Sequence, residues 1–430
     1  MRIAAVAFRD FPPFADAIME FPRCGSNGAG GEVHLLTGAN GTGKTRLLCL
    51  LAAACGNSAS LDQRVPPERA KRVAVVGEGE RGVPRGGWVR EQGRAFWTEA
   101  RDAATLIRSD KPFPVHEQSP NIATCGRAAA AALAFRGMAR VSDAKISALA
   151  PVKLGPPAEH LTFEPAKEED KILCQSMANL KMAAAMDFLR KSPRTESRAI
   201  RLVERLESAL TRITGRSFAF DVTPHPDVSL RVFWGGVTMS LMQTPDGLRS
   251  IIGWLVSCVS KLAAMFPEDG EPLSRPLILL LDEPEGHLHP AWQRKVLPAA
   301  QALFPHAQVF AATHSPFVIS SVNEGWIHIF RADDAGTVTV DAPRECSKGD
   351  TYLDVVEEVL GVKEWYDPET EELLAKFRQT RDAILAGKGD RTDLESQAKV
   401  IAERSESLRD LMAREMRQLD RVVAQASARP

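Results

Sequence analysis

A glycine-rich stretch, GANGTGKT, runs from Gly38 to Thr45 and is the clearest chemical feature of the sequence. It matches the pattern G-x-x-x-x-G-K-[ST] in full and lies between an expected strand and an expected helix. Glycines let such a loop turn tightly, so its amides point inward at phosphates, and the helix N-terminus adds its dipole. We predict a nucleotide-binding loop that comprises Gly38, Asn40, Gly41, Thr42, Gly43, Lys44, Thr45 and Arg46.

Two side chains of this loop have separate predicted tasks. Lys44 is expected to reach the β- and γ-phosphates, and the Thr45 hydroxyl is expected to hold Mg²⁺.

A second stretch, LILLLDEP, is an apolar strand that ends in adjacent carboxylates. Asp282 is predicted to hold Mg²⁺ through its water shell, while Glu283 orients and polarises the attacking water.

A third stretch, FAATHSP, places His314 at the end of the next expected strand. A histidine at that position can hydrogen-bond the γ-phosphate and sense its presence. We therefore predict ATP hydrolysis with Lys44, Glu283 and His314 as catalytic residues and with ATP and Mg²⁺ as ligands.

The elements that must position these residues follow from hydrophobic periodicity. Strands are expected at RIAAVAFRDF, before the glycine loop, at LILLL and at QVFAATH, with helices between them. Pro290 and the Ser315-Pro316 pair are helix starts. Residues 57–125 are weakly periodic, and GEGERGVPRGGWVREQGR within them is expected to form a mobile loop or a strand pair with a long connection. The strands FAFDV, VSLRVFW and VTMSLM include a hairpin turn at Gly235-Gly236.

Composition narrows the class of protein. The chain has 430 residues, a formal net charge of -1 and 44% hydrophobic residues, which excludes a strongly basic, histone-like binder. The cysteines are scattered and form no CxxC pair, which indicates buried thiols in a reducing compartment. We expect neither a signal peptide nor an apolar run long enough to span a membrane, and therefore a cytoplasmic protein.

These motifs together resemble the ABC-type ATPases of the RecF, chromosome-maintenance and OLD-like group. DEPEGHLHP followed by THSP is similar to the stand-alone ATPases of bacterial antiphage defence systems. The resemblance implies an α/β fold with an ABC-type head, an inserted helical lobe and a C-terminal helical hairpin. It also implies that two heads sandwich two nucleotides, which makes the protein a homodimer or higher oligomer.

The signature loop of that family is expected ahead of the Asp282-Glu283 strand. TPDGLRS lies there, with Asp246 and Gly247 in the D-G variant and Pro245 where a serine is usual. The helix that follows has one apolar face, and its first amides, at Gly247 and Leu248, are expected to face an anion.

Several assignments stay open at this stage. Gln92 and Gln118 are both candidates for a glutamine that couples the metal site to the helical lobe. Phe11 or Phe14 either stacks on adenine or belongs to the core. His287 and His289 are expected at the subunit interface rather than in a metal site. Residues 391–423 are expected to form one long helix, packed on its own domain or on a partner.

The predicted organisation has three parts. Residues 1–60 and 216–345 are expected to form the ATPase core, residues 61–215 an inserted lobe and residues 346–430 a C-terminal helical region. The resemblance implies a sensor or regulatory ATPase of antiphage defence that controls a separate effector, a nuclease or toxin. FRADDAG has adjacent aspartates and not the Asp-x-Asp pair of a nuclease, so we expect any nuclease to be a separate partner protein. The alternatives are a RecF-like repair ATPase that binds DNA through Arg81, Arg85, Arg90 and Arg94, or an ATP-binding scaffold with little turnover.

Overall fold

The structure is a computed structural model that describes most of the chain. The chain divides into two compact units, Met1–Leu360 and Gly361–Pro430. The described residues are 2–24, 31–65, 72–78, 86–91, 94–99, 131–137, 142–144, 146, 152, 160–163, 169–190, 197–223, 228–346, 349 and 351–427.

A mostly parallel sheet forms the centre of the first unit. Its strand order is β14 (Val338–Val340), β13 (Trp326–Ala332), β3 (Glu32–Gly38), β12 (Ala307–Ala312), β11 (Leu277–Asp282) and β7 (Ala131–Arg136), with β15 (Arg344–Glu345) beside β13. The five strands from β13 to β7 run parallel. Their carboxyl ends therefore meet at one edge of the sheet, where ligands of such sheets bind.

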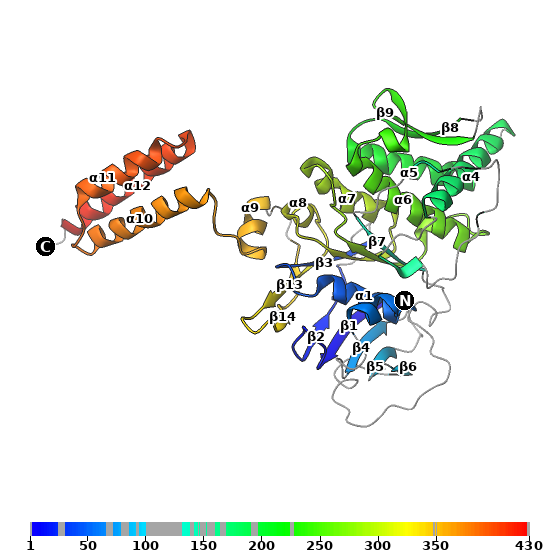
Figure 1. Cartoon of the computed structure of the whole chain (residues 1–430), viewed down its shortest axis with the longest axis horizontal. Coiled ribbons are helices and arrows are strands. Elements are labelled where there is room, and N and C mark those ends of the chain that lie inside the picture. Colours follow the sequence, from blue (N-terminus) through cyan, green and yellow to red (C-terminus); the bar gives the residue numbers. More distant parts are fainter. Residues whose placement is uncertain are drawn as a thin grey trace. The chain divides into compact units, whose positions relative to one another are not determined.

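The apolar strand β11 shows why both faces of this sheet are covered. Its side chains alternate: Leu277, Leu279 and Leu281 join one hydrophobic cluster, and Ile278 and Leu280 join another. Figure 1 shows helices on one face and α1 with an antiparallel sheet on the other. The helices of the first face are α4 (Glu169–Leu189), α5 (Arg198–Thr214), α6 (Asp246–Met265) and α7 (Pro290–Leu303).

The antiparallel sheet lies on the same face as α1 (Lys44–Ala54). Its order is β2 (Ala17–Glu20), β1 (Arg2–Arg9), β4 (Arg72–Glu78), β5 (Gly86–Glu91) and β6 (Arg94–Glu99). The short helix α2 (Ala59–Arg64) follows α1. Of the two predictions for GEGERGVPRGGWVREQGR, residues 77–94, the strands are correct where the structure describes this stretch.

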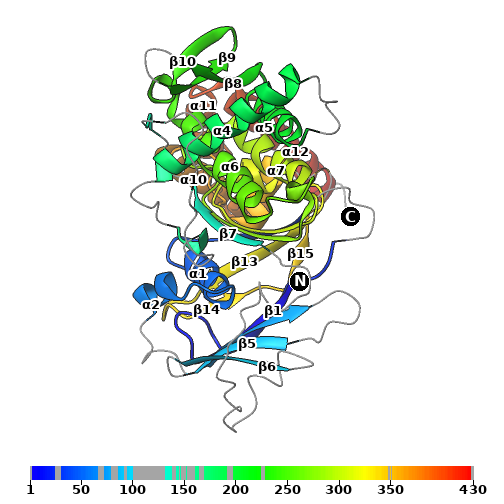
Figure 2. The same ribbon diagram turned by 90° about the vertical axis from the view of Figure 1, so that its right-hand side faces the viewer.

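A three-stranded sheet contacts α4 and α5 (Figure 2) and consists of β8 (Phe218–Thr223), β9 (Ser229–Trp234) and β10 (Val237–Ser240). Gly235 and Gly236 have φ angles of 58° and 95°, which confirms the predicted hairpin turn. A single 3-10 turn, Leu241–Gln243, then leads into α6. Another 3-10 turn, Pro272–Ser274, precedes β11.

Helix α6 is longer and more apolar than the sequence prediction allowed. By length and composition it is the one candidate membrane span among the described residues, with a mean hydropathy of 1.4. The expectation that no run is long enough was therefore wrong, but 78% of this window is buried inside the first unit. Its apolar face, with Leu248, Ile251, Leu255 and Val259, packs in the core, which is typical of a core helix.

The predicted helix starts near the end of the first unit are confirmed. His289 caps α7 ahead of Pro290, and Ser315 caps α8 (Pro316–Ile319) by accepting a hydrogen bond from the amide of Val318. Helix α9 (Tyr352–Asp354) and a π-helical turn, Val355–Val359, complete this part of the chain.

The second unit contains α10 (Pro368–Leu385), α11 (Arg391–Ala402) and α12 (Glu406–Ser427). The single helix predicted over residues 391–423 was wrong, because the chain breaks between α11 and α12. Ser405, which departs from the apolar repeat, accepts a hydrogen bond from the amide of Leu408 and so caps α12. The small core of this unit is formed by Leu374, Phe377, Leu394, Ala398, Ile401, Leu408, Met412 and Leu419.

Candidate active site

The glycine-rich loop joins β3 to α1 at the carboxyl edge of the central sheet. Gly38 and Gly43 both have left-handed backbone, with φ angles of 142° and 87°. A Cβ on Gly38 would lie 2.3 Å from the carbonyl oxygen of Phe330, and one on Gly43 would lie 2.8 Å from the ring of Phe14. A larger side chain would require a backbone shift at Gly38 and a movement of the Phe14 ring at Gly43, so the loop conformation depends on these glycines.

Lys44 is the first residue of α1 and is almost fully buried. Its Nζ atom donates hydrogen bonds to the carbonyl oxygens of Gly38 at 3.0 Å and Ala39 at 2.9 Å. Burial lowers its pKa from 10.5 to about 8, and the nearby charges of Asp282 and Glu283 oppose that shift. The ammonium group is thus held at the centre of the loop, where phosphate would neutralise it.

Asp282 ends β11 directly opposite the first turn of α1. The hydroxyl of Thr45 donates to its Oδ1 atom at 2.9 Å, whereas its Oδ2 atom is buried without a hydrogen-bond partner among the described residues. Burial raises the pKa of Asp282, and the Thr45 bond and Arg136 act in the opposite direction. A hydroxyl and a carboxylate with an unsatisfied oxygen are ligands suited to hydrated Mg²⁺. The residues present therefore fit this metal ion.

Glu283 follows in an unusual backbone conformation. Its φ angle is 51°, in the left-handed region that non-glycine residues seldom adopt, and its amide donates to the carbonyl of Ala312 at 2.9 Å. The chain therefore turns sharply at the end of the strand, and Glu283 lines the same cavity as Lys44 and Thr45. Such strain is common where a side chain must be aimed at a reaction site.

His314 lies one strand away, just beyond the end of β12. Burial lowers its pKa, the charge of Lys44 lowers it further, and Glu283 acts in the opposite direction. A lowered pKa favours the neutral imidazole at pH 7, which has one hydrogen-bond donor and one acceptor. His314 can thus hydrogen-bond a phosphate without adding a full charge.

These residues surround a cavity of about 300 Å³. Its walls are formed by Asn40, Gly41, Gly43, Lys44, Thr45, Arg46, Arg64, Asp282, Glu283, Ala312 and His314. The structure thus brings together residues predicted from three separate motifs. Gly38 and Thr42 belong to the loop but not to the walls, and Thr42 instead donates to the carbonyl of Ala39 at 2.9 Å.

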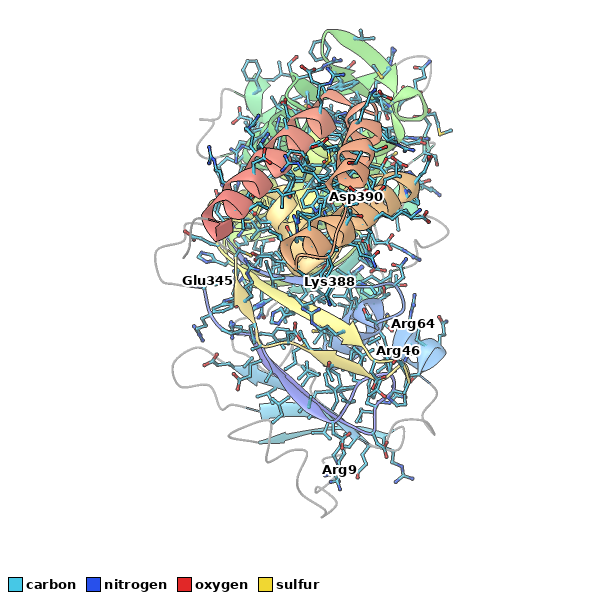
Figure 3. All side chains as sticks on the ribbon, turned by 90° about the vertical axis from the view of Figure 1, so that its left-hand side faces the viewer. Arg9, Arg46, Arg64, Glu345, Lys388 and Asp390 are labelled. Atoms are coloured by element: carbon cyan, nitrogen blue, oxygen red, sulfur yellow. The ribbon has the colours of Figure 1, made fainter. Side chains whose placement is uncertain are left out.

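Three functional candidates were missed in the sequence. Arg64, at the end of α2, lines the cavity beside Arg46, and Figure 3 shows these two arginines close together. Glu285 is a half-buried residue with a buried carboxylate, whose Oε1 atom accepts hydrogen bonds from the Thr313 hydroxyl at 2.6 Å and the His314 amide at 3.0 Å. The Nε atom of Arg136 lies 3.8 Å from Asp282 Oδ2. Only Glu285 had a signal in the sequence, namely its place in DEPE.

The predicted signature residues lie away from this cavity. Asp246 is exposed at the start of α6 and pairs with Arg249, whereas Gly247 and Leu248 are buried. A Cβ on Gly247 would lie 2.7 Å from the carbonyl oxygen of His287, so α6 packs closely on the loop after Glu283. Asp246 and Gly247 therefore do not join their own chain's Lys44 site.

Of the two roles left open for Phe11 and Phe14, the structure supports a place in the core. Both side chains are buried, Phe11 completely and Phe14 to 5% exposure, and Phe14 stacks on Phe8 with ring centroids 4.5 Å apart. Because the ring of Phe14 also lies under Gly43, it supports the phosphate loop instead.

The other open assignments have mixed outcomes. Gln92, Gln118, Arg81 and Arg85 lie outside the described residues. His287 and His289 are exposed, and the part of the chain that the structure describes contains no group of three or more metal-ligating His, Cys, Asp or Glu side chains.

Comparison with known proteins identifies the family. Residues 99–320 match the model described as "AAA domain, putative AbiEii toxin, Type IV TA system", and residues 28–133 match a second AAA-domain model. The chain is 31% identical over 112 residues to "Retron Vc95 probable ATPase" of Vibrio cholerae, covering 26% of this chain and 21% of that protein. It is 28% identical over 143 residues to "Septu protein PtuA" of Bacillus thuringiensis, covering 32% and 36%. The matches thus span about a fifth to a third of these relatives.

Solved structures give a weaker similarity. The SMC head domain from Thermotoga maritima superimposes with a TM-score of 0.43 and 12% identity, covering 80% of this chain and 99% of that one. The SMC head bound to the C-terminal winged-helix domain of ScpA has a TM-score of 0.46. The family match is the more informative, because it covers residues 99–320, more than half of the 430 residues. The chain therefore belongs to the AAA-domain family of P-loop ATPases.

Proposed function

We propose that this protein hydrolyses ATP with Mg²⁺ at the cavity between the phosphate loop and the end of β11. The observation that carries the proposal is that Lys44, Thr45, Asp282, Glu283 and His314 all line this one cavity. They come from three strand ends that adjoin in the sheet. Together these residues provide groups that bind phosphate, groups that bind a metal ion and a carboxylate that orients the attacking water. Phosphoryl transfer uses all three.

Thr45 and Asp282 are the residues that would hold Mg²⁺, through its water shell in the case of Asp282. When bound, the ion neutralises negative charge on the β- and γ-phosphates. Lys44 adds a second positive charge close to those oxygens, and the loop amides add oriented dipoles.

Glu283 and His314 act on the γ-phosphate side of the cavity. Glu283 orients the attacking water and accepts its proton as the new P–O bond forms and the bond from the γ-phosphorus to the β–γ bridging oxygen breaks, which releases ADP. His314, held neutral by its surroundings, hydrogen-bonds the transferring phosphoryl group. Glu285 fixes the backbone of His314, because its carboxylate accepts a hydrogen bond from that amide.

The substitution Glu283→Gln tests the reaction directly. It keeps the side-chain size and removes the base, so we expect hydrolysis to fall by about 100-fold or more while ATP binding persists. Steady-state phosphate release and equilibrium ATP binding are the two measurements. An unchanged rate, or a wild-type protein with no turnover, would favour the ATP-binding scaffold instead.

We also propose that two heads close on ATP, with Asp246 and Gly247 of one chain completing the site of the other. The position of these residues supports this, because they lie outside their own cavity while α6 begins at the surface. The contacts between the two subunits would form only with ATP present. Because Glu283→Gln binds ATP but hydrolyses it slowly, this variant should accumulate as an ATP-dependent dimer.

Charge reversal at Asp246 tests this surface more cleanly than a change at Gly247. Gly247 packs on a backbone carbonyl, so a larger residue there would disturb the fold, whereas the Asp246 side chain is 46% exposed. In the Glu283→Gln background we expect Asp246→Arg to abolish ATP-dependent dimerisation and retain ATP binding. Glu268→Arg, exposed just beyond the other end of α6, is the control. Dimerisation of the Asp246→Arg protein, measured by light scattering, would contradict the assignment.

The biological role that we propose is a regulatory ATPase of a cytoplasmic antiphage defence system that controls a separate effector, a nuclease or toxin. The support is sequence similarity to proteins named as retron and Septu components. Co-purification with the product of the neighbouring gene tests this role, with Glu283→Gln expected to stabilise the complex in ATP. A replication gene as neighbour, with no complex formed, would favour DNA repair.

Direct DNA binding through the predicted arginines is less well supported. Arg90 is buried and forms an ion pair with Asp62 at 2.6 Å, so it does not face solvent. Of the two described arginines in that set, only Arg94 is exposed. A salt-sensitive, DNA-stimulated ATPase rate would restore this alternative.

A further inference from the structure

The segment Arg136-Gly137, at the end of edge strand β7, makes contacts that the proposed reaction does not yet use. Strand β7 pairs in parallel with β11, and the register places Arg136 beside Asp282. The amide of Gly137 then donates to the carbonyl of Asp282 at 2.9 Å, which continues the ladder past the end of both strands. This segment is therefore fixed to the metal-binding carboxylate by its backbone.

The Arg136 side chain faces the same carboxylate. Its Nε atom lies 3.8 Å from Asp282 Oδ2, and neither atom has a hydrogen-bond partner within the described ranges. The separation is too long for a direct hydrogen bond but is within the range of an ion pair, and both atoms are buried. A small movement of Asp282 would thus change its electrostatic attraction to the guanidinium group. A water molecule bound to a metal ion at Asp282 would change it as well.

Gly137 connects Asp282 to the turn at Glu283 and to helix α6. A Cβ at Gly137 would lie only 1.8 Å from the carbonyl oxygen of Glu283, so its backbone packs directly on the turn that aims Glu283. Its own carbonyl accepts a hydrogen bond from the hydroxyl of Ser250, a buried residue in the second turn of α6. One dipeptide thus contacts Asp282, Glu283 and helix α6.

We infer that Arg136 and Gly137 form the element that couples the metal-binding carboxylate to helix α6, with Arg136 and Ser250 as positioning residues. The inference rests on the proposed nucleotide site. It places an arginine and a backbone carbonyl between Asp282 and the start of α6. A shift of Asp282 on binding of metal and nucleotide would pass through Gly137 to Ser250 and so to the exposed end of the helix.

The experiment measures hydrogen exchange at residues 246–250 with and without a non-hydrolysable ATP analogue and Mg²⁺. In the wild type we expect the ligand to slow exchange there several-fold. In Ser250→Ala and Arg136→Met we expect less than a twofold change, with analogue affinity kept within about threefold. Ser257→Ala, a buried serine about 10 Å further along α6, is the matched control and should respond as the wild type does.

Kinetics give a second readout. We expect Arg136→Met to lower kcat at least tenfold with KM for ATP nearly unchanged, and Arg136→Lys, which keeps the charge, to recover most of that loss. Wild-type exchange protection in both Ser250→Ala and Arg136→Met would overturn the inference. If Arg136→Met folds poorly, hydrogen exchange in Ser250→Ala tests the inference by itself. Failure of the wild type to bind the analogue would instead overturn the proposed function.

Discussion

Glu285 shows how a single buried carboxylate can organise an active site without touching its ligand. Its Oε1 atom holds the Thr313 hydroxyl and the His314 amide, while burial raises its pKa. Gln293 extends the contact, because its Oε1 atom accepts from Ser315 at 2.6 Å and its Nε2 atom donates to the Leu288 carbonyl at 2.8 Å. The position of His314 is thus linked to the loop that carries Glu283.

Arg64 is predicted to act in ATP hydrolysis. Its guanidinium group lines the cavity with Arg46 (Figure 3), where it can approach phosphate oxygens as their charge develops. We expect Arg64→Ala to lower kcat by about tenfold or more and to change ATP affinity much less. Steady-state hydrolysis and ATP titration test this, with Arg94→Ala, an exposed arginine on β6, as control. Equal kcat values for Arg64→Ala and the wild type would show that Arg64 does not act in the reaction.

At the scale of elements, local motifs were predictable and pairings between distant segments were not. The phosphate loop, Asp282-Glu283 and His314 each follow a short apolar strand, so their neighbours in the sequence identify them. Arg136 was missed because its role depends on the pairing of β7 with β11, which no local pattern specifies. The break at Ser405 was missed because the apolar repeat resumes beyond this one off-pattern residue, whose side chain caps α12 in the structure.

The cap at Ser405 leads to a prediction for the second unit. The amide of Leu408 donates to its hydroxyl at 3.2 Å, and removal of an N-cap oxygen destabilises a helix by about 1 kcal/mol. We expect Ser405→Ala to lower the free energy of unfolding of residues 361–430 by this amount. Ser396→Ala, at an exposed position of α11, should change it by less than about 0.5 kcal/mol. Urea unfolding, followed by helical circular dichroism, would contradict the cap if both variants behaved alike.

At the scale of the whole molecule, a buried polar network connects the central sheet to the antiparallel sheet that contains β1. The Gln308 side chain accepts from the amide of Ile3 and donates to its carbonyl, both at 2.8 Å, so β12 is bonded to β1. Nearby, His34 Nδ1 lies 3.2 Å from His328 Nε2, and His34 Nε2 lies 2.8 Å from Glu32, which also pairs with Arg2. Four strands therefore meet at this network, on the side of the sheet with Phe21 and Phe310.

This network predicts how the stability of the first unit depends on pH. Burial lowers the pKa of both histidines below the ordinary value of 6.5, and for His328 the charge of His34 adds to the effect. Both are therefore neutral in the folded protein at a pH where the unfolded chain already binds protons. As pH falls below 6.5, unfolding takes up protons, and stability decreases by up to about 1.4 kcal/mol per pH unit for each histidine.

The pKa of Glu32 does not reverse this trend between pH 7.5 and 5. Burial alone would raise it, but hydrogen bonds from Arg2 and His34 lower it below 4.5, so its contribution is lost only at more acidic pH. We expect the urea midpoint, followed by tryptophan fluorescence, to fall over this range and His328→Phe to reduce the slope by about half. His306→Gln, at an exposed histidine, should leave the slope unchanged. An equal pH slope in the wild type and in His328→Phe would mean that His328 takes up its proton without destabilising the first unit.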